Sequence, residues 1–282
     1  MTAMLETFDF DDFVRRVLAE DLGTGGDVTS RATIAADARF VATMTCREPI
    51  TVAGINLAVA FFRALDPDVR IGQPVADGQA VPAGTTLLEL EGSARAMLAA
   101  ERSALNTLQH LSGIATLTAR YVAAMGGSKA KLLDTRKTIP GLRALDKYAV
   151  RMGGALNHRM RMDDGLLIKD NHVAVAGGVG SAVRLAKAAA TGLQVQVEVD
   201  RLDQIEEALA AGADRLLLDN MSANTLAEAV AIVAGRVPLE ASGGVNLETI
   251  AGIAASGVDF VSVGRITQSA PAVDVGLDYL LR

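Results

Sequence analysis

The sequence predicts an α/β protein in two parts, with a small antiparallel sheet and a long helix ahead of an incomplete α/β barrel. Three observations lead to this fold class. Short β-branched runs separated by turn residues fill positions 38–92. An uninterrupted Ala- and Leu-rich stretch covers 94–125. From residue 129 onward, short apolar runs alternate with Ala-rich segments, as strands and helices do in parallel α/β folds.

The N-terminal part contains three kinds of element in order. Positions 11–20 have an apolar face of helical spacing that includes Phe13 and Val17, and this helix is expected to stop at Gly23. The runs FVATMTC, PITVAG and TTLLELEG, separated by DPD, ADG and PAG turns, predict the antiparallel sheet. The helix that begins at Ala94 should end near Met125, where two glycines follow.

Six apolar runs form the barrel part: KLLDTRK, GLLIKDN, QVQVEVD, DRLLLDN, VPLEASGG and DFVSVGR. The last four begin at about 194, 215, 237 and 259, which is the spacing of one strand, one helix and two short loops. This regularity predicts parallel strands. About 150 residues are fewer than the ~250 of a barrel with eight full units, so we expect a smaller or incomplete barrel.

Composition excludes several classes of protein. Half of the 282 residues are apolar and Cys46 is the only cysteine, which argues against disorder and against a disulfide scaffold. The N-terminus is acidic and aromatic rather than basic, and no apolar run approaches ~20 residues. We therefore expect a cytoplasmic protein that neither is exported nor spans a membrane.

The charge is distributed unevenly along the chain. Lys and Arg number 27 against 33 acids, a formal net charge of −6 that argues against nucleic-acid binding. Residues 129–172 nevertheless hold ten Lys or Arg and five acids, a net charge of +5, which leaves −11 elsewhere. Aromatic residues are few and Trp is absent, so a small polyanion is the expected ligand of this segment.

Polar residues follow every barrel run, at the strand ends where α/β folds bind ligands. Because the carboxyl ends of parallel strands meet at one edge, we expect these residues to form a single site. They are Arg136, Lys137, Lys169, Asp170, Glu198, Asp200, Asp219, Asn220, Ser242, Gly243, Gly244, Gly264 and Arg265.

The last two strand ends resemble phosphate-binding loops, although each glycine alone is equally explained by a tight turn. Glu198 and Asp219, on successive strand ends, suit Mg²⁺ or ribose hydroxyls, or else orient neighbouring cations. His158 stands out from an ordinary structural histidine because Arg159 follows it in the most basic segment. On the long helix, Arg102, Asn106, His110 and Gly113 form a polar strip that a solvated face explains adequately.

With these positions established, the sequence resembles the quinolinate phosphoribosyltransferase family. The matching stretches run through most of the chain, and TRKT-PGLR together with NHR and LIKDNH is highly specific. They are EDLGTGGDVTS (20–30), ERSALNTLQHLSGIAT (101–116), LLDTRKTIPGLRALDKYAVRMGGALNHR (132–159), LIKDNH (167–172), VEVD (197–200), LLLDN (216–220) and EASGGV (240–245).

The resemblance implies the fold of a type II phosphoribosyltransferase: an N-terminal open-faced α/β sandwich (1–110, joined by the tail 269–282) and an incomplete α/β barrel (111–268). It also implies a homodimer in which Arg102 reaches into the partner's active site. The implied reaction joins quinolinate to 5-phosphoribosyl 1-diphosphate, with Mg²⁺, and gives nicotinate mononucleotide, diphosphate and CO₂ for NAD biosynthesis.

Site roles are carried over from the resemblance residue by residue. It implies that Arg102, Arg136, Lys137, His158 and Arg159 hold the two quinolinate carboxylates. Lys169 would contact the diphosphate substrate near the reacting centre, and Glu198 and Asp219 would bind the ribose hydroxyls and Mg²⁺. Ser242, Gly243, Gly244, Gly264 and Arg265 would take the 5-phosphate, with Thr135 and Val263 also lining the site. Catalytic roles fall to Lys137, Lys169, Glu198 and Asp219.

The sequence leaves three alternatives open. A paralogue of the same fold, such as a nicotinate phosphoribosyltransferase, would act on a monocarboxylate, but the density of cations favours a dicarboxylate. A Schiff-base aldolase would use Lys169 at its strand end. A non-enzymatic carrier module is suggested by the turns of ADGQAVPAGTTLLELEG, which lack the modified lysine of such carriers. Gln268 stands where many relatives have His, so position 268 is left out of the predicted site.

Overall fold

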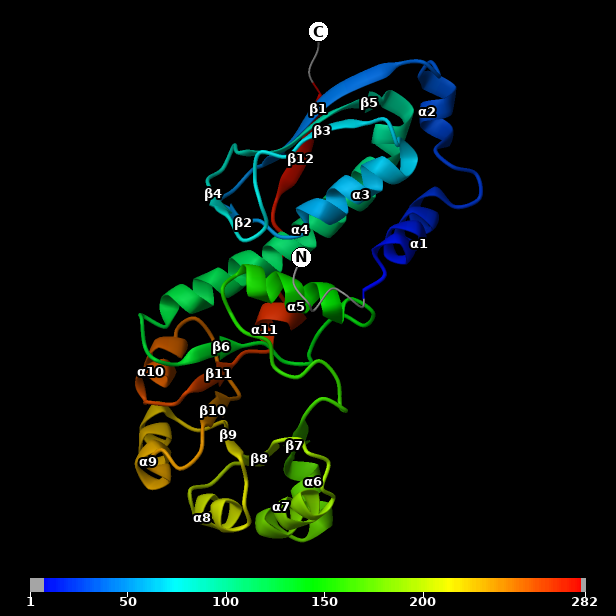
Figure 1. The fold of residues 1–282 in the computed structure, drawn as a ribbon. Coiled ribbons are helices and arrows are strands. Elements are labelled where there is room, and N and C mark those ends of the chain that lie inside the picture. The colour runs from blue at the N-terminus through cyan, green and yellow to red at the C-terminus, as the bar shows by residue number, and fades with distance from the viewer. Residues whose placement is uncertain (1–7, 280–282) are drawn as a thin grey trace. The chain divides into compact units, whose positions relative to one another are not determined.

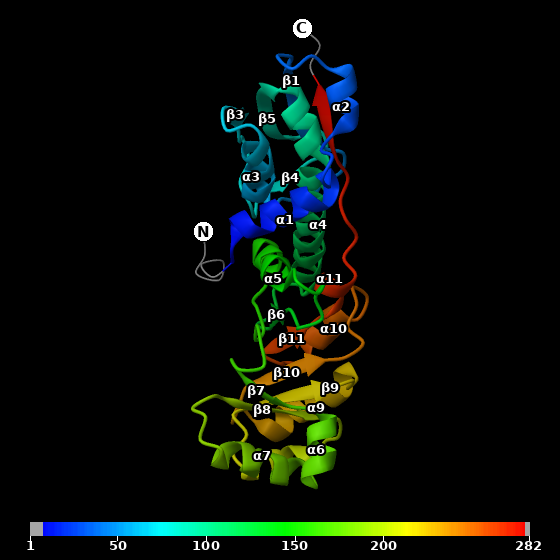
Figure 2. The same cartoon turned by 90° about the vertical axis from the view of Figure 1, so that its right-hand side faces the viewer.

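The computed structural model describes residues 8–279. The chain divides into two compact units, which we describe separately (Figures 1 and 2). The first holds Met1–Ala119, Ala144–Gly154 and Ser269–Arg282, and the second holds Arg120–Arg143 and Ala155–Gln268. The boundary between the two units falls within helix α4 (Ala94–Ala124), between Ala119 and Arg120. The domain boundary expected from the sequence lies at residue 110 of the same helix.

An antiparallel sheet forms the centre of the first unit. Its strands are ordered β12 (Val275–Tyr279), β1 (Arg39–Cys46), β5 (Thr86–Ser93) and β3 (Arg70–Gly72). A separate pair is formed by β2 (Ile50–Thr51) and β4 (Ala80–Val81). Strand β12 pairs with β1, with Leu277 opposite Met44, so the C-terminal tail returns to the N-terminal sheet as the resemblance implied.

One face of this sheet is buried and the other is polar. Met44, Leu88 and Leu90 are buried, whereas Thr43 and its cross-strand partner Glu89 point to the opposite face. This alternation is the period-2 pattern of a sheet with one solvated side. It accounts for the open-faced sandwich.

The helices of the first unit include one that the sequence pattern does not predict. The first helix is present as α1 (Phe10–Leu22), and the glycine-rich segment after it contains α2 (Val28–Thr33). Helix α3 (Ile55–Leu65) lies within the segment 38–92, for which only strands were expected, and that expectation was wrong. Most α3 side chains are buried, and only Asn56 and Arg63 are polar in INLAVAFFRAL, which is too few to reveal a helical period.

The long helix α4 confirms the prediction for 94–125, but its polar strip is only partly solvated. Arg102 and Asn106 are exposed. His110 Nε2 lies 2.8 Å from Asp146 Oδ1 on α5 (Arg143–Met152), and Asp146 is fully buried. Gly113 packs so closely on the tail that an added Cβ would overlap the carbonyl oxygen of Pro271. The solvated-face interpretation therefore holds only for the first half of the strip.

The second unit is built on a parallel sheet of six strands among the described residues, in the order β6-β11-β10-β9-β8-β7. Each of the six apolar runs forms one of them, so the prediction of parallel strands and of fewer than eight units is confirmed. The strands are β6 (Lys131–Leu133), β7 (Leu166–Ile168), β8 (Val195–Val199), β9 (Arg215–Asp219), β10 (Leu239–Ser242) and β11 (Phe260–Ser262).

Helices follow the strands and contact one another in sequence order, α7 with α8, α8 with α9 and α9 with α10. Strand residues such as Val197, Leu216 and Ala241 are buried in this layered structure. Within residues 8–279, no helix combines the length and apolar character that a bilayer crossing needs. The helices are α6 (Asp170–Ala176), α7 (Val179–Ala188), α8 (Asp203–Ala210), α9 (Ala223–Val233), α10 (Ile250–Ala255) and α11 (Arg265–Gln268).

Candidate active site

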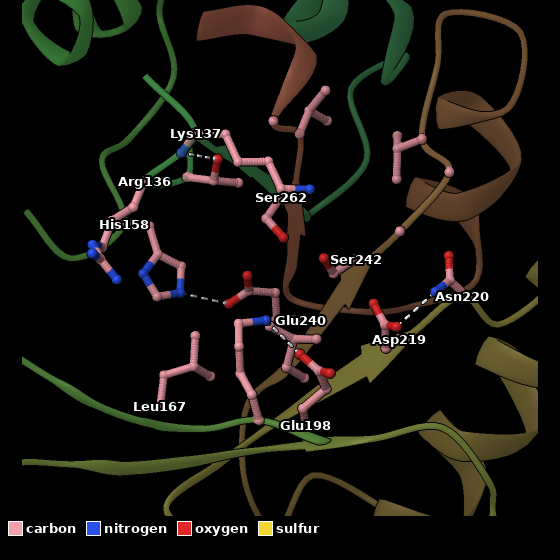
Figure 3. A pocket seen from close by; sticks show the side chains of 18 of the residues that line it. Arg136, Lys137, His158, Leu167, Glu198, Asp219, Asn220, Glu240, Ser242 and Ser262 are labelled. Carbon is pink, nitrogen blue, oxygen red and sulfur yellow. Dashed lines mark hydrogen bonds and ion pairs between the residues drawn. The ribbon is translucent and has the colours of Figure 1, made fainter. Parts of the chain in front are cut away.

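A pocket of about 720 Å³ lies at the carboxyl ends of the parallel strands, within the second unit (Figure 3). The predicted site residues line it with two exceptions, Arg102 and the strand-end residue Asp200; those present are Thr135, Arg136, Lys137, His158, Arg159, Lys169, Glu198, Asp219, Ser242, Gly243, Gly244, Val263, Gly264 and Arg265. Arg102 belongs to the first unit and is exposed on α4. The topology therefore collects residues from six strand ends and their loops in one cavity.

One end of the pocket concentrates positive charge. Arg136, Lys137 and Arg159 reach it from two loops, and His158 lies beside them. The buried Nε of Arg136 has no hydrogen-bond partner among residues 8–279. Burial lowers the pKa of Arg159, and the charge of Arg136 nearby lowers it further. Both observations identify a place where an anionic ligand would be stabilised, because it would compensate two crowded guanidinium groups.

The loop that carries Arg136 and Lys137 is held by contacts from distant parts of the chain. The hydroxyl of Thr267, on α11, donates to the carbonyl oxygen of Lys137 at 2.8 Å. The side chain of Lys137 passes close to Gly264, where an added Cβ would lie 2.9 Å from Lys137 Cδ. A real Cβ does not come that near a neighbouring carbon, so the glycine leaves room for this lysine.

Acidic residues occupy the other side of the pocket. Lys169 Nζ lies 2.6 Å from Glu198 Oε2 at the ends of β7 and β8. Burial raises the pKa of Asp219, and the negative charge of Glu198 raises it further, whereas Lys169 and a hydrogen bond from Asn220 oppose the shift. The carboxylates of Glu198 and Asp219 therefore repel each other electrostatically. A cation or a hydroxyl donor between them would reduce this repulsion.

A glycine loop follows β10. Gly243 has a φ of +90°, in the left-handed region, and an added Cβ would overlap the side-chain oxygen of Asn220. The backbone N–H of Asn220 donates to the carbonyl oxygen of Ser242 at 2.8 Å, which ties the ends of β9 and β10 together. Only glycine fits this close approach, so the loop can bring its main-chain amides near a ligand oxyanion.

The donor set fits Mg²⁺ carried by a substrate rather than a metal site formed by protein side chains alone. In the described part of the chain, no cluster of three or more His, Cys, Asp or Glu side chains has metal-binding geometry. Glu198 and Asp219 together offer oxygen ligands, and magnesium commonly takes one or two carboxylates plus phosphate oxygens and water. Burial, and after it the charge of Glu198, raises the pKa of Asp219, so a cation bound beside Asp219 would favour its ionised form.

Several lining residues were not predicted as part of the site. Gln268 lines the pocket, although position 268 was left out of the predicted site. The sequence did carry a signal for Glu240: it precedes Ser242 by two positions on one strand, so both side chains point to the same face. The other unpredicted residues are Leu167, Leu217, Val245 and Ser262, and Asp170 and Asn220 were expected only as strand-end residues.

Comparison with known proteins gives the family. Residues 27–112 match the family model described as quinolinate phosphoribosyl transferase, N-terminal domain, and residues 114–278 match the one described as its C-terminal domain. The nicotinate-nucleotide pyrophosphorylase [carboxylating] of Mycobacterium leprae is 45% identical over 283 residues, covering 98% of this chain and 100% of that protein.

Two further relatives agree. The quinolinate phosphoribosyltransferase [decarboxylating] 2, mitochondrial, of Nicotiana glauca is 39% identical over 290 residues, covering 96% of this chain and 82% of that protein. The solved nicotinate-nucleotide pyrophosphorylase of Francisella tularensis superposes with a TM-score of 0.93 at 42% identity, covering 99% of this chain and 100% of that one. Sequence, fold and pocket agree over nearly the whole chain, and the chain belongs to the quinolinate phosphoribosyltransferase family.

Proposed function

We propose that this protein transfers the phosphoribosyl group of 5-phosphoribosyl 1-diphosphate to quinolinate, with decarboxylation, and so makes nicotinate mononucleotide, diphosphate and CO₂. It is a pentosyltransferase of NAD biosynthesis. The observation that carries this assignment is the pocket's separation of charge. Its cationic end holds Arg159 and Arg136, whose buried Nε has no hydrogen-bond partner among residues 8–279, and its acidic side holds Glu198 and Asp219. An acceptor with two carboxylates fits the first, and a ribose with Mg²⁺ and phosphates fits the second.

The cationic end holds the acceptor. Arg136, Lys137 and Arg159 bind the two carboxylates of quinolinate, with His158 beside them, and Arg guanidinium groups suit them because they can bond both oxygens of a carboxylate at once. These carboxylates would neutralise the positive charges of Arg136 and Arg159, and this neutralisation would contribute to the binding of quinolinate. A monocarboxylate such as nicotinate would leave part of this positive charge without a partner.

The acidic side stabilises charge that develops during transfer. As the bond from C1′ to diphosphate breaks, positive charge grows on the ribose ring, and Glu198 and Asp219 lie where their negative charge can stabilise it. Lys169, paired with Glu198, lies at the same strand ends and contacts the diphosphate substrate near the reacting carbon. The pyridine nitrogen of quinolinate is the nucleophile, so no covalent intermediate with the protein is required.

The 5-phosphate binds at the last two strand ends. The main chain of Ser242, Gly243 and Gly244 and of Gly264 offers amides to phosphate oxygens, and Arg265 adds a charge. Thr135 and Val263 complete this wall of the pocket. Glu198 and Asp219 would hold Mg²⁺ together with the substrate's oxygens, and when bound the ion would neutralise the departing diphosphate.

Decarboxylation follows transfer. Once the ring nitrogen carries the ribose it is cationic, and it stabilises the electron pair left on C2 as CO₂ leaves; a proton from solvent then takes the place of the carboxylate on C2. The residues of the cationic end hold the other carboxylate and thereby keep the ring in place.

Arg102 completes the site from a second subunit. Because it is exposed on the first unit and absent from the pocket lining, we assign it to the quinolinate site of the partner in a homodimer. A cytoplasmic location fits the single, buried cysteine, Cys46.

The proposed function is tested by product analysis. Purified protein with Mg²⁺ and 5-phosphoribosyl 1-diphosphate should release diphosphate and CO₂ in equal amounts from quinolinate labelled at the 2-carboxylate. Nicotinate serves as the matched acceptor that lacks this group. Consumption of nicotinate in preference to quinolinate would instead identify a paralogous activity of the same fold.

A further inference from the structure

Glu240 is a charged residue at the floor of the pocket whose side chain is wholly buried. It sits on β10, level with Leu217 of β9, which in turn lies level with Glu198 of β8. Transfer of a carboxylate into a protein interior is costly unless partners compensate it. The compensation must therefore come from the side chains around Glu240.

Three side chains from different parts of the second unit converge on one oxygen of Glu240. Gln196 Nε2 donates to Oε2 at 2.8 Å, and Arg215 Nη2 forms an ion pair with it at 2.6 Å. Arg215 is itself held in place, with its guanidinium 3.9 Å from the centre of the Phe260 ring. Burial raises the pKa of Glu240, but His158, Arg215 and Gln196 outweigh that effect and lower the pKa below its ordinary value. The group is an anion at neutral pH.

The third partner is His158. Its Nε2 lies 3.5 Å from Glu240 Oε2, a contact visible in Figure 3. The other ring nitrogen, Nδ1, is 2.7 Å from the backbone nitrogen of Arg159. A backbone N–H can only donate, so Nδ1 is the acceptor and carries no proton. The proton of a neutral ring is then on Nε2, the nitrogen that lies 3.5 Å from the carboxylate.

This arrangement links the floor of the pocket to a residue that binds substrate. The imidazole bridges Glu240 on one side and the main chain of Arg159 on the other. The same segment is held from the opposite direction by Asp134, which accepts the N–H of His158 at 2.8 Å. Two buried carboxylates thus determine where the segment that presents the Arg159 guanidinium lies.

We propose that Glu240 is a positioning residue for the reaction: its carboxylate holds His158 in the tautomer with the proton on Nε2, and this in turn keeps Arg159 aligned with the quinolinate carboxylates. The effect of Glu240 on quinolinate binding rests on the proposed function. The tautomer of His158, in contrast, is a property of the protein without substrate.

The test compares two double variants that differ only at position 240. In Glu240→Gln/Arg215→Met and Glu240→Met/Arg215→Met, the buried ion pair is removed from both sides, so neither variant leaves an uncompensated charge in the core. Glutamine keeps an oxygen that can accept the Nε2 proton, whereas methionine, of similar length, has none of comparable strength.

Two readouts distinguish orientation from simple stability. The chain has three histidines, so the imidazole ¹⁵N–¹H spectrum of histidine-labelled protein is simple, and the signals lost in His158→Asn identify His158. We expect one tautomer, protonated at Nε2, in the wild type and in the glutamine variant, and a mixture in the methionine variant. The quinolinate KM should rise about tenfold in the methionine variant relative to the glutamine variant, with kcat changed less.

The proposal is overturned if His158 of the wild type carries its proton on Nδ1, or if both double variants show the same tautomer and the same KM. Thermal melts of both variants verify that they are folded. A wild-type protein that does not consume quinolinate would refute the proposed function, while the tautomer measurement would still test the orientation of His158 by Glu240.

Discussion

Lys169 and Glu198 form an ion pair across two neighbouring strand ends, with Nζ 2.6 Å from Oε2. The lysine side chain is 48% exposed and the glutamate 10%, so the pair stands at the wall of the pocket with its cation toward the open side. An ion pair this accessible contributes little to folding. Under the proposed function, its contribution is to hold a cation and an anion at the place where the diphosphate leaves and the ribose becomes positive.

Lys169→Met should therefore abolish activity without unfolding the protein. We expect kcat to fall about 100-fold or more, because a preorganised charge at the reacting centre is lost, and the melting temperature to change by only about 2 °C. Lys187→Met is the matched control, since Lys187 is 39% exposed in a 2.7 Å ion pair with Asp214 outside the pocket. Equal loss of activity in both variants would contradict a site-specific role for Lys169.

Gly264→Ala should impair the site by displacing Lys137. The new methyl group would lie 2.9 Å from Lys137 Cδ, which forces the lysine to move. Because small displacements of substrate-binding groups are costly, we expect kcat/KM for quinolinate to fall about 10- to 100-fold.

Gly252→Ala provides the control for this substitution. Gly252 lies on an exposed part of α10, and its added Cβ would meet nothing nearer than Ala223 Cβ at 3.9 Å. That variant should keep full activity and gain up to about 1 kcal/mol of stability from helix propensity. If Gly264→Ala is as active as Gly252→Ala, the activity does not depend on the observed position of the Lys137 side chain.

Mixed dimers test the contribution of Arg102. In a heterodimer of one Arg102→Ala subunit and one Lys169→Ala subunit, a site shared between subunits leaves one of two sites intact, so roughly half of the wild-type activity should return. Differently tagged subunits allow the heterodimer to be purified, and light scattering establishes its mass. Heterodimers no more active than the two parent variants would place Arg102 in its own subunit's site or outside the site.

Asp214 should make stability depend on pH in the acid range. Burial raises the pKa of Asp214, but hydrogen bonds from Lys187 Nζ and the Val195 N–H outweigh it, so the pKa lies below the ordinary 3.8. A lowered pKa means that the folded state binds the proton less tightly than the unfolded state. The resulting stabilisation is complete above about pH 4 to 5 and disappears as pH falls through the folded-state pKa.

The variant Asp214→Asn keeps an oxygen for the Val195 N–H but removes the charge. At neutral pH its melting temperature should lie about 2 °C below that of the wild type, as for a half-exposed ion pair. The difference should shrink between about pH 5 and pH 3, as followed by circular dichroism. A gap that widens toward acid pH would refute the assignment.

Local patterns in the sequence account for much of the second unit. Each predicted apolar run forms a parallel strand, because a strand buried on both faces is a short continuous apolar segment and the helices between them are Ala-rich and regularly spaced. Polar residues directly after these strands had to meet, since parallel strands end at a common edge. This is why Lys169, Glu198, Asp219 and Gly243 can be assigned to one pocket from the sequence alone.

Other features have no local signal. Helix α3 is not predicted because it is apolar almost all round, and the segment 144–154 joins the first unit although the barrel strands flank it in sequence. The sequence places Glu240 on the same strand face as Ser242, but it gives no sign that its partners Gln196 and Arg215 come from two other strands. The path of Lys137 depends on Gly264, which lies far away in the chain.

The sequence by itself determined the order of the elements, the parallel sheet and the residue types of the pocket. The hydrophobic period, the turn residues and the ends of strands are all local patterns of residues that are neighbours in the sequence. Only the tertiary structure decided which nitrogen of His158 faces Glu240, how Asp219 and Glu198 perturb each other, and that Lys137 passes over Gly264. Those properties depend on distances of a few ångströms between residues remote in sequence, and charges, hydrogen bonds and steric overlap act over just such distances.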